Sequence, residues 1–179
     1  MHPEERFRQI YAQTYRRTAA QIMAGARQTA DAADLIQEVY LELYQIILRR
    51  GEAYIKSPEA LMAKLAKQAL ARYYRSMSRR VEVYESPSDD GITAELPDIE
   101  AASVEEITEE REVIAWTERY LAGRGEDVRK IFHLYYRFGL TLTEIAQLTG
   151  RSESDVKNKL YRTLREIRAH WKGGKHETE

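Results

Sequence analysis

The clearest structural signal in the chain lies in residues 141–171, which read TLTEIAQLTGRSESDVKNKLYRTLREIRAHW. Thr141 can cap a helix, and Glu144, three residues later, can close a capping box with it. Gly150 can take the left-handed conformation that ends this helix, and Ser152 can cap a second one. The stretch therefore predicts two helices joined by a tight turn.

Apolar residues in the same stretch predict how the two helices pack. They recur along the second helix at steps of three or four residues, the spacing of one buried helix face. The inward set is Ile145, Ala146 and Leu148 on the first helix and Val156, Leu160, Leu164, Ile167 and Trp171 on the second.

The positions left on the outer side of the second helix are polar and mostly basic. With the arginine at the turn, they are Arg151, Ser154, Lys157, Asn158, Tyr161, Arg162 and Arg165. Such side chains can hydrogen-bond base edges and neutralise phosphates. We interpret the stretch as a DNA-binding helix-turn-helix; the alternative is an ordinary helical hairpin with a solvated basic face.

The composition of the 179 residues, 43% hydrophobic and 32% charged, is that of a soluble globular protein. No apolar run approaches the roughly 18 residues of a membrane span, and the first residues lack a signal peptide's apolar core, so we expect no membrane insertion and a cytoplasmic location. There is no cysteine, and the four histidines are scattered. No metal or other cofactor is expected, and no enzyme, since paired carboxylates and activated nucleophiles are not recognisable.

The net charge of −1 conceals a strong division along the chain. Residues 1–80 carry a net charge of +6, residues 81–112 of −11 and residues 113–179 of +4. Two basic ends around an acidic middle indicate two modules that face nucleic acid, joined by a segment that DNA would repel.

The basic amino-terminal part predicts a bundle of three amphipathic helices. They are expected over about residues 4–24, 31–50 and 58–80. Asp31, with Asp34 three residues on, can cap the second helix, and Ser57 followed by Pro58 can start the third. The expected core is Phe7, Ile10, Tyr11, Tyr15, Ile22, Met23, Leu35, Ile36, Val39, Leu43, Ile46, Ile47, Leu61, Met62, Leu65, Ala69, Leu70 and Tyr73.

Two faces of this bundle carry candidate binding residues. On the second helix Leu41 is an apolar residue in a polar setting, which is typical of a partner-binding surface; a solvated acidic face is the alternative. This face comprises Asp34, Gln37, Glu38, Leu41 and Glu42. On the third helix basic side chains alternate with tyrosine, a combination that binds single-stranded nucleic acid. That stripe comprises Lys64, Lys67, Gln68, Arg72, Tyr73, Arg75 and Arg79.

Between the basic ends, residues 81–110 contain Pro87 and Pro97 and no sustained helical period before Val104, so we interpret them as an extended linker. Two further helices are expected ahead of the helix-turn-helix, from about Val104 to Leu121 and from about Val128 to near Gly139. The predicted architecture is all-α. It has two small helical domains, residues 1–80 and 111–173, a linker over residues 81–110 and a tail over residues 174–179.

Two motifs in this arrangement resemble a known family. Residues 31–41 read DAADLIQEVYL, which is similar to a D-A-x-D-L-x-Q-E-x-aromatic-L motif, and residues 156–162, VKNKLYR, resemble the family's recognition-helix run. Over nearly its full length the chain resembles a bacterial RNA polymerase sigma factor of the small extracytoplasmic-function (ECF) type, in the sigma-70 superfamily.

This resemblance implies a role and a set of partners. The second-helix face would dock on core RNA polymerase, the third helix would melt and read the promoter −10 element, and the helix-turn-helix would read the −35 element as duplex DNA. The linker would thread the polymerase's active-site and RNA-exit channel. An anti-sigma protein is a further partner that the resemblance implies. The protein would thus direct promoter recognition, DNA melting and transcription initiation.

The third helix departs from the family pattern. Ala66-Lys67-Gln68 and then Arg72 stand where many relatives have an Ala-Arg-Asn run followed by an aspartate, and arginine cannot accept the hydrogen bonds that a carboxylate would. Two other functions stay open on the sequence. A stand-alone helix-turn-helix regulator would bind duplex operator DNA without polymerase, as a two-fold dimer. A helical adaptor would bind proteins only.

Overall fold

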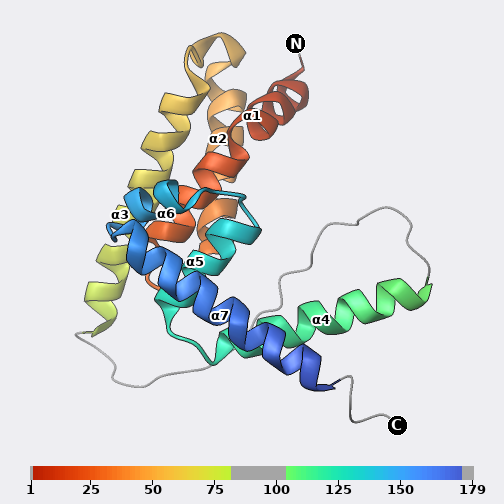
Figure 1. Cartoon of the computed structure of the whole chain (residues 1–179). Helices are drawn as coiled ribbons and strands as arrows, with labels where there is room; N and C mark the ends of the chain where they lie inside the picture. Colours follow the sequence, from red (N-terminus) through yellow and green to blue (C-terminus); the bar gives the residue numbers. More distant parts are fainter. Residues whose placement is uncertain (1, 82–103, 175–179) are drawn as a thin grey trace. The chain divides into compact units, whose positions relative to one another are not determined.

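The computed structural model describes residues 2–81 and 104–174, and within these ranges the regular structure is entirely helical (Figure 1). The helices are α1 (Pro3–Gly25), α2 (Ala32–Arg50), α3 (Pro58–Val81), α4 (Val104–Ala122), α5 (Glu126–Tyr136), α6 (Leu142–Thr149) and α7 (Glu153–Gly174), with a short 3-10 helix η1 (Glu52–Tyr54). The all-α prediction is confirmed. The chain divides into two compact units, Met1–Thr93 and Ala94–Glu179.

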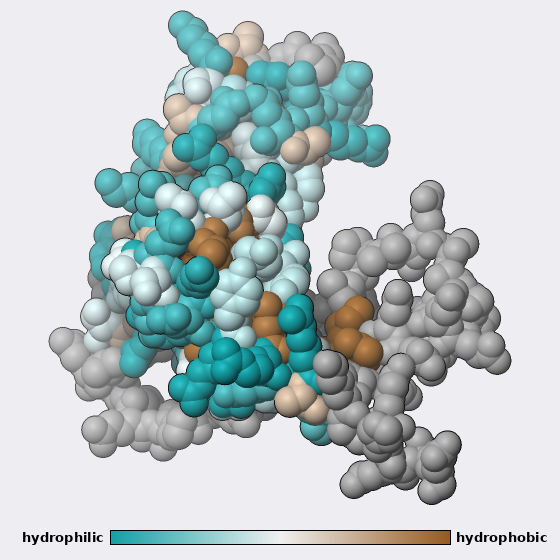
Figure 2. Space-filling model, in the orientation of Figure 1, coloured by the Kyte–Doolittle hydropathy of each residue, from teal (hydrophilic) through white to brown (hydrophobic). Residues whose placement is uncertain are grey.

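Most of the described surface on the face drawn in Figure 2 is hydrophilic, with a few isolated hydrophobic patches. A membrane-crossing helix would need a long apolar run, and none of the described helices has one.

The amino-terminal unit is a bundle in which α1, α2 and α3 each contact the other two. Many of the predicted core residues are buried here, among them Ile10, Ile22, Val39, Leu43, Ile47, Met62, Leu65 and Ala69. Tyr40 was not in the predicted core but is 5% exposed. Its hydroxyl lies 3.0 Å from the Thr14 Oγ1 atom, so both buried polar groups are hydrogen-bonded. Tyr11, predicted to be in the core, is 38% exposed.

The start of α2 differs from the prediction. Asp31 precedes the helix, but its backbone is in the right-handed helical conformation and its side chain makes no capping hydrogen bond. Its carboxylate instead accepts a hydrogen bond of 2.5 Å from the Tyr73 hydroxyl on α3. The predicted cap is wrong because a contact between helices, which the local sequence does not reveal, engages this side chain.

In the carboxy-terminal unit, α6 and α7 form the predicted helix-turn-helix. The Thr141 Oγ1 atom accepts a hydrogen bond of 3.3 Å from the Glu144 amide, and the Glu144 carboxylate accepts one of 2.8 Å from the Thr141 amide. Gly150 has a φ of 66° and ends α6 in the left-handed conformation. The Ser152 hydroxyl then accepts a hydrogen bond of 3.2 Å from the Asp155 amide. Capping residues therefore fix both sides of the turn.

The core of this unit lies between α5, α6 and α7, which all contact one another. Its fully buried side chains include Ile131, Leu134, Ile145, Val156 and Leu160. Leu148, predicted to face inward, is 40% exposed, so this prediction is wrong. The covered side of α6 runs through Leu142, Ile145, Ala146 and Thr149. Leu148 lies on the flank of that stripe. The side chain of Trp171 lies outside the described part of the chain.

Most of the predicted linker, residues 82–103, lies outside the described residues. Helix α4 begins at Val104, where the apolar period of the sequence begins, so residues 104–110 are helical and do not belong to an extended segment. At the other end, α7 includes Gly174, which the sequence places in the tail, and residues 175–179 are not described.

Candidate nucleic-acid interface

Helix α7 presents the predicted outer face to solvent. Val156, Leu160 and Ile167 anchor the helix in the core of its unit. On the other side, six residues of the predicted set are exposed: Ser154, Lys157, Asn158, Tyr161, Arg162 and Arg165. The exposed face therefore offers cations for phosphates and hydroxyl and amide groups for base edges.

Arg151, the seventh predicted residue, has two acidic partners within the unit. Its guanidinium forms ion pairs with Asp127 on α5 and, at 3.0 Å, with Asp155 on α7. Asp155 also pairs with Lys159 at 2.5 Å. These hydrogen bonds, first that of Lys159 and then that of Arg151, lower the pKa of the Asp155 carboxyl. The acidic charge at the start of α7 is thus balanced by neighbouring cations, and Arg151 braces the turn against α5.

A second polar network joins α7 to α4. The Glu166 carboxylate accepts a hydrogen bond from the Tyr120 hydroxyl and forms ion pairs with Arg124 at 2.8 Å and Arg162 at 3.2 Å. The pKa of Glu166 is lowered, mainly by the Tyr120 hydrogen bond. One turn further along α7, Trp116 and His170 stack with ring centroids 4.1 Å apart. These side-chain contacts join the end of α4 to the middle and end of α7.

The lowered pKa of Glu166 predicts a pH-dependent contribution to stability. The ionised carboxylate stabilises the folded unit above its ordinary pKa of 4.5, and this contribution is lost as pH falls through the lower folded-state value. Glu166→Gln should therefore lower the melting temperature at pH 7, and the difference from wild type should close below pH 4.5. Tryptophan fluorescence is a selective probe, because both tryptophans, Trp116 and Trp171, lie in this unit. An equal difference at both pH values would contradict the assignment.

The structure adds residues to this face that the sequence reading missed. A shallow hollow of about 410 Å³ on α7 is lined by Tyr161, Leu164, Arg165, Arg168 and Ala169. Tyr136, on α5, is 51% exposed. Burial and the neighbouring tyrosines, Tyr161 among them, raise the pKa of Tyr136, whereas the charge of Arg168 lowers it. The sequence could have indicated Arg168, because it follows Arg165 by three residues and so lies on the same side of the helix. The position of Tyr136 depends on packing between helices and has no such signal.

On α2 the predicted partner-binding face is solvent-accessible. Asp34, Gln37 and Glu38 are exposed, Leu41 is 58% exposed and Glu42 is half-buried. Leu48, two turns beyond Leu41, is also exposed. The surface thus combines an exposed leucine with carboxylates.

On α3 the predicted basic stripe is only partly free for nucleic acid. Lys64, Lys67, Gln68 and Arg75 are exposed. Arg72 forms ion pairs with Glu38 and Glu42 of α2. Tyr73 is half-buried, and burial together with the Asp31 carboxylate raises its pKa to about 12. The side chain of Arg79 lies outside the described part of the chain.

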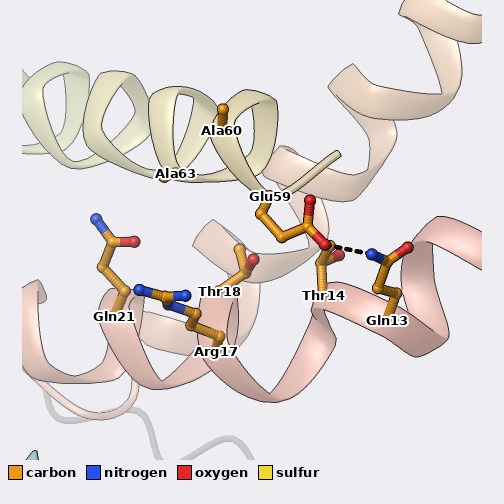
Figure 3. A pocket seen from close by; sticks show the side chains of 8 residues that line it. All are labelled: Gln13, Thr14, Arg17, Thr18, Gln21, Glu59, Ala60 and Ala63. Carbon is orange, nitrogen blue, oxygen red and sulfur yellow. Dashed lines mark hydrogen bonds between the residues drawn. The ribbon is translucent and has the colours of Figure 1, made fainter. Parts of the chain in front are cut away.

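The sequence reading also missed a hollow of about 280 Å³ between α1 and α3 (Figure 3). It is lined by Gln13, Thr14, Arg17, Thr18, Gln21, Glu59, Ala60 and Ala63. The Gln13 amide donates a hydrogen bond to the Glu59 carboxylate and joins the two helices there. Polar side chains of α1 therefore face a carboxylate and two alanine methyl groups of α3 across this hollow.

The capped turn, the packed pair α6 and α7 and the exposed basic side of α7 define a helix-turn-helix DNA-binding domain. Residues 126–167, which span α5, α6 and most of α7, match the family model "Sigma-70, region 4". The match confirms the sigma-70 resemblance for this part of the chain and supports a DNA-binding role in promoter recognition. No curated protein matches the chain.

Proposed function

We propose that the protein is a sigma factor of the ECF type, which binds core RNA polymerase and directs it to promoters. The observation that carries this proposal is the match of residues 126–167 to sigma-70 region 4, on a helix-turn-helix whose basic side is exposed. A region 4 domain reads the −35 element, so Lys157, Arg162 and Arg165 would contact duplex DNA. The chain would act in the cytoplasm, where polymerase and promoters are.

The amino-terminal unit supplies the polymerase and −10 contacts in this proposal. Asp34, Gln37, Glu38, Leu41 and Glu42 form the polymerase-binding face, and the exposed positions of α3 hold the melted −10 strand. Lysine and arginine would neutralise its phosphates, and each base stacked on an aromatic ring would contribute about 1 to 3 kcal/mol. The protein itself would make or break no covalent bond. It would position polymerase and stabilise opened DNA.

The direct test combines the purified chain with core RNA polymerase and a library of promoter fragments. We expect the chain to co-purify with core polymerase and to direct it to transcribe a subset of the fragments. Core polymerase without the chain should not select these fragments. A stand-alone regulator would instead bind duplex fragments without polymerase, as a two-fold dimer. Selective duplex binding by the free chain, with no retention on core polymerase, would overturn the proposal.

A further inference from the structure

Arg72 connects the two candidate surfaces of the amino-terminal unit. Its Nη2 atom lies 2.8 Å from Glu38 Oε1 and 2.9 Å from Glu42 Oε2, and its Nε atom lies 3.1 Å from Glu38 Oε1. One guanidinium on α3 therefore holds two carboxylates that are one turn apart on α2. Both carboxylates belong to the polymerase-binding face, whereas the sequence assigns Arg72 to the DNA-binding stripe.

The position of Arg72 on α3 explains this pairing. Lys64, Lys67, Ala71 and Arg75 follow one another at steps of three or four residues along the exposed side of the helix. Arg72 lies at the edge of that stripe, on the side where α3 packs against α2. Arg75, in contrast, donates a hydrogen bond of 3.2 Å to the Ala71 carbonyl of its own helix. The two arginines thus have different surroundings although they are three residues apart.

The charge of the cluster disfavours DNA as the ligand of Arg72. One guanidinium and two carboxylates sum to a net charge of −1, so a phosphate approaching Arg72 would meet two negative groups at 2.8 and 2.9 Å from it. The cluster remains accessible to a protein partner, because the three side chains are 42%, 50% and 35% exposed. Arg72 contacts one oxygen of each carboxylate, and the second oxygens can accept hydrogen bonds from a partner.

We propose that Arg72 is a positioning residue of the polymerase-binding face, where it orients Glu38 and Glu42 toward core RNA polymerase instead of contacting promoter DNA. This inference rests on the proposed function. Arginine suits the role because its planar fork can hold two acceptors in fixed directions, which the ammonium of lysine does less well. Since ion pairs this exposed contribute little to stability, the role of Arg72 concerns orientation more than folding.

The test measures the affinity of the full chain for core polymerase without DNA. Arg72→Ala should weaken it roughly 3- to 10-fold, within the range of coupled pairs, and Arg72→Lys should recover part of the loss. Arg75→Ala is the matched control, with the same charge change on the same helix, and should leave core affinity unchanged. In the holoenzyme, Arg75→Ala should reduce the salt dependence of binding to a single-stranded oligonucleotide, whereas Arg72→Ala should not.

A double-mutant cycle separates positioning from a general loss of charge. Once Glu38→Gln has removed the partner carboxylate, Arg72→Ala should have little additional effect on core affinity. Three results would each overturn the assignment. Arg72→Ala could bind core polymerase as tightly as wild type does, the two substitutions could have additive effects in the cycle, or Arg72→Ala could lower the salt dependence as much as Arg75→Ala does. Melting curves check that Arg72→Ala is folded. If Arg72→Ala does not fold, Glu42→Gln tests the same cluster. Wild-type chain that fails to bind core polymerase would instead refute the proposed function, and this inference with it.

Discussion

Leu41→Asp is expected to abolish the association of the chain with core RNA polymerase. Leu41 is 58% exposed and is surrounded on α2 by polar and acidic side chains. The few residues that dominate a protein interface lie near its centre inside a ring of weaker contacts, and losing one of them costs about 2 kcal/mol or more, about a 30-fold change in affinity; we expect Leu41 to be such a residue. Aspartate removes this anchor and adds a charge that binding would have to bury without a partner, which increases the loss. The fraction of the chain that is retained on immobilised core polymerase measures this loss of affinity.

Leu48→Asp is the matched control for this experiment. Leu48 lies on the same helix, is 52% exposed and undergoes the same chemical change, but it lies outside the predicted polymerase-binding face. We expect Leu48→Asp to bind core polymerase as wild type does. Both variants should stay folded, since each replaces an exposed side chain. Undiminished binding of Leu41→Asp, or an equal loss in both variants, would contradict the assignment of the face to Asp34–Glu42.

Features that depend on neighbouring residues in the sequence could be predicted. The turn between α6 and α7 is an example, because Thr141, Glu144 and Gly150 act within a few residues of one another. The exposed side of α7 follows from its period and from the small number of buried positions that anchor it. Family resemblance to sigma-70 region 4 rests on the same stretch, and the match to residues 126–167 agrees with it.

Features that depend on contacts between helices could not be predicted. Asp31 has the spacing of a cap, yet the hydroxyl of Tyr73, 42 residues away, takes its carboxylate. Arg72 has the spacing of a DNA-binding residue, yet Glu38 and Glu42 lie within reach only because α2 packs against α3. Helical periodicity gives the side of a helix on which a residue lies, but not the side chains that the neighbouring helix places opposite it.

The combined substitution of Lys157, Arg162 and Arg165 by alanine is expected to remove most of the affinity of the carboxy-terminal unit for duplex DNA. All three side chains are exposed on one side of α7. Arg162 pairs with Glu166 at 3.2 Å, but its side chain is 82% exposed. A pair of this exposure is weak in water, so a phosphate can replace the carboxylate at little cost. Each lost phosphate contact should flatten the dependence of log affinity on log salt by about 0.9.

Lys159→Ala provides the matched control, because it removes the same charge from the same helix as Lys157→Ala. Lys159 is half-buried and pairs with Asp155 at 2.5 Å, so it is not expected to contact phosphate. Duplex binding measured between about 50 and 200 mM salt, the range over which phosphate contacts change affinity most visibly, should therefore distinguish the two lysines. If the triple variant binds duplex DNA with the wild-type affinity and salt slope, α7 does not read DNA. The chain would then fit a helical adaptor that binds only proteins.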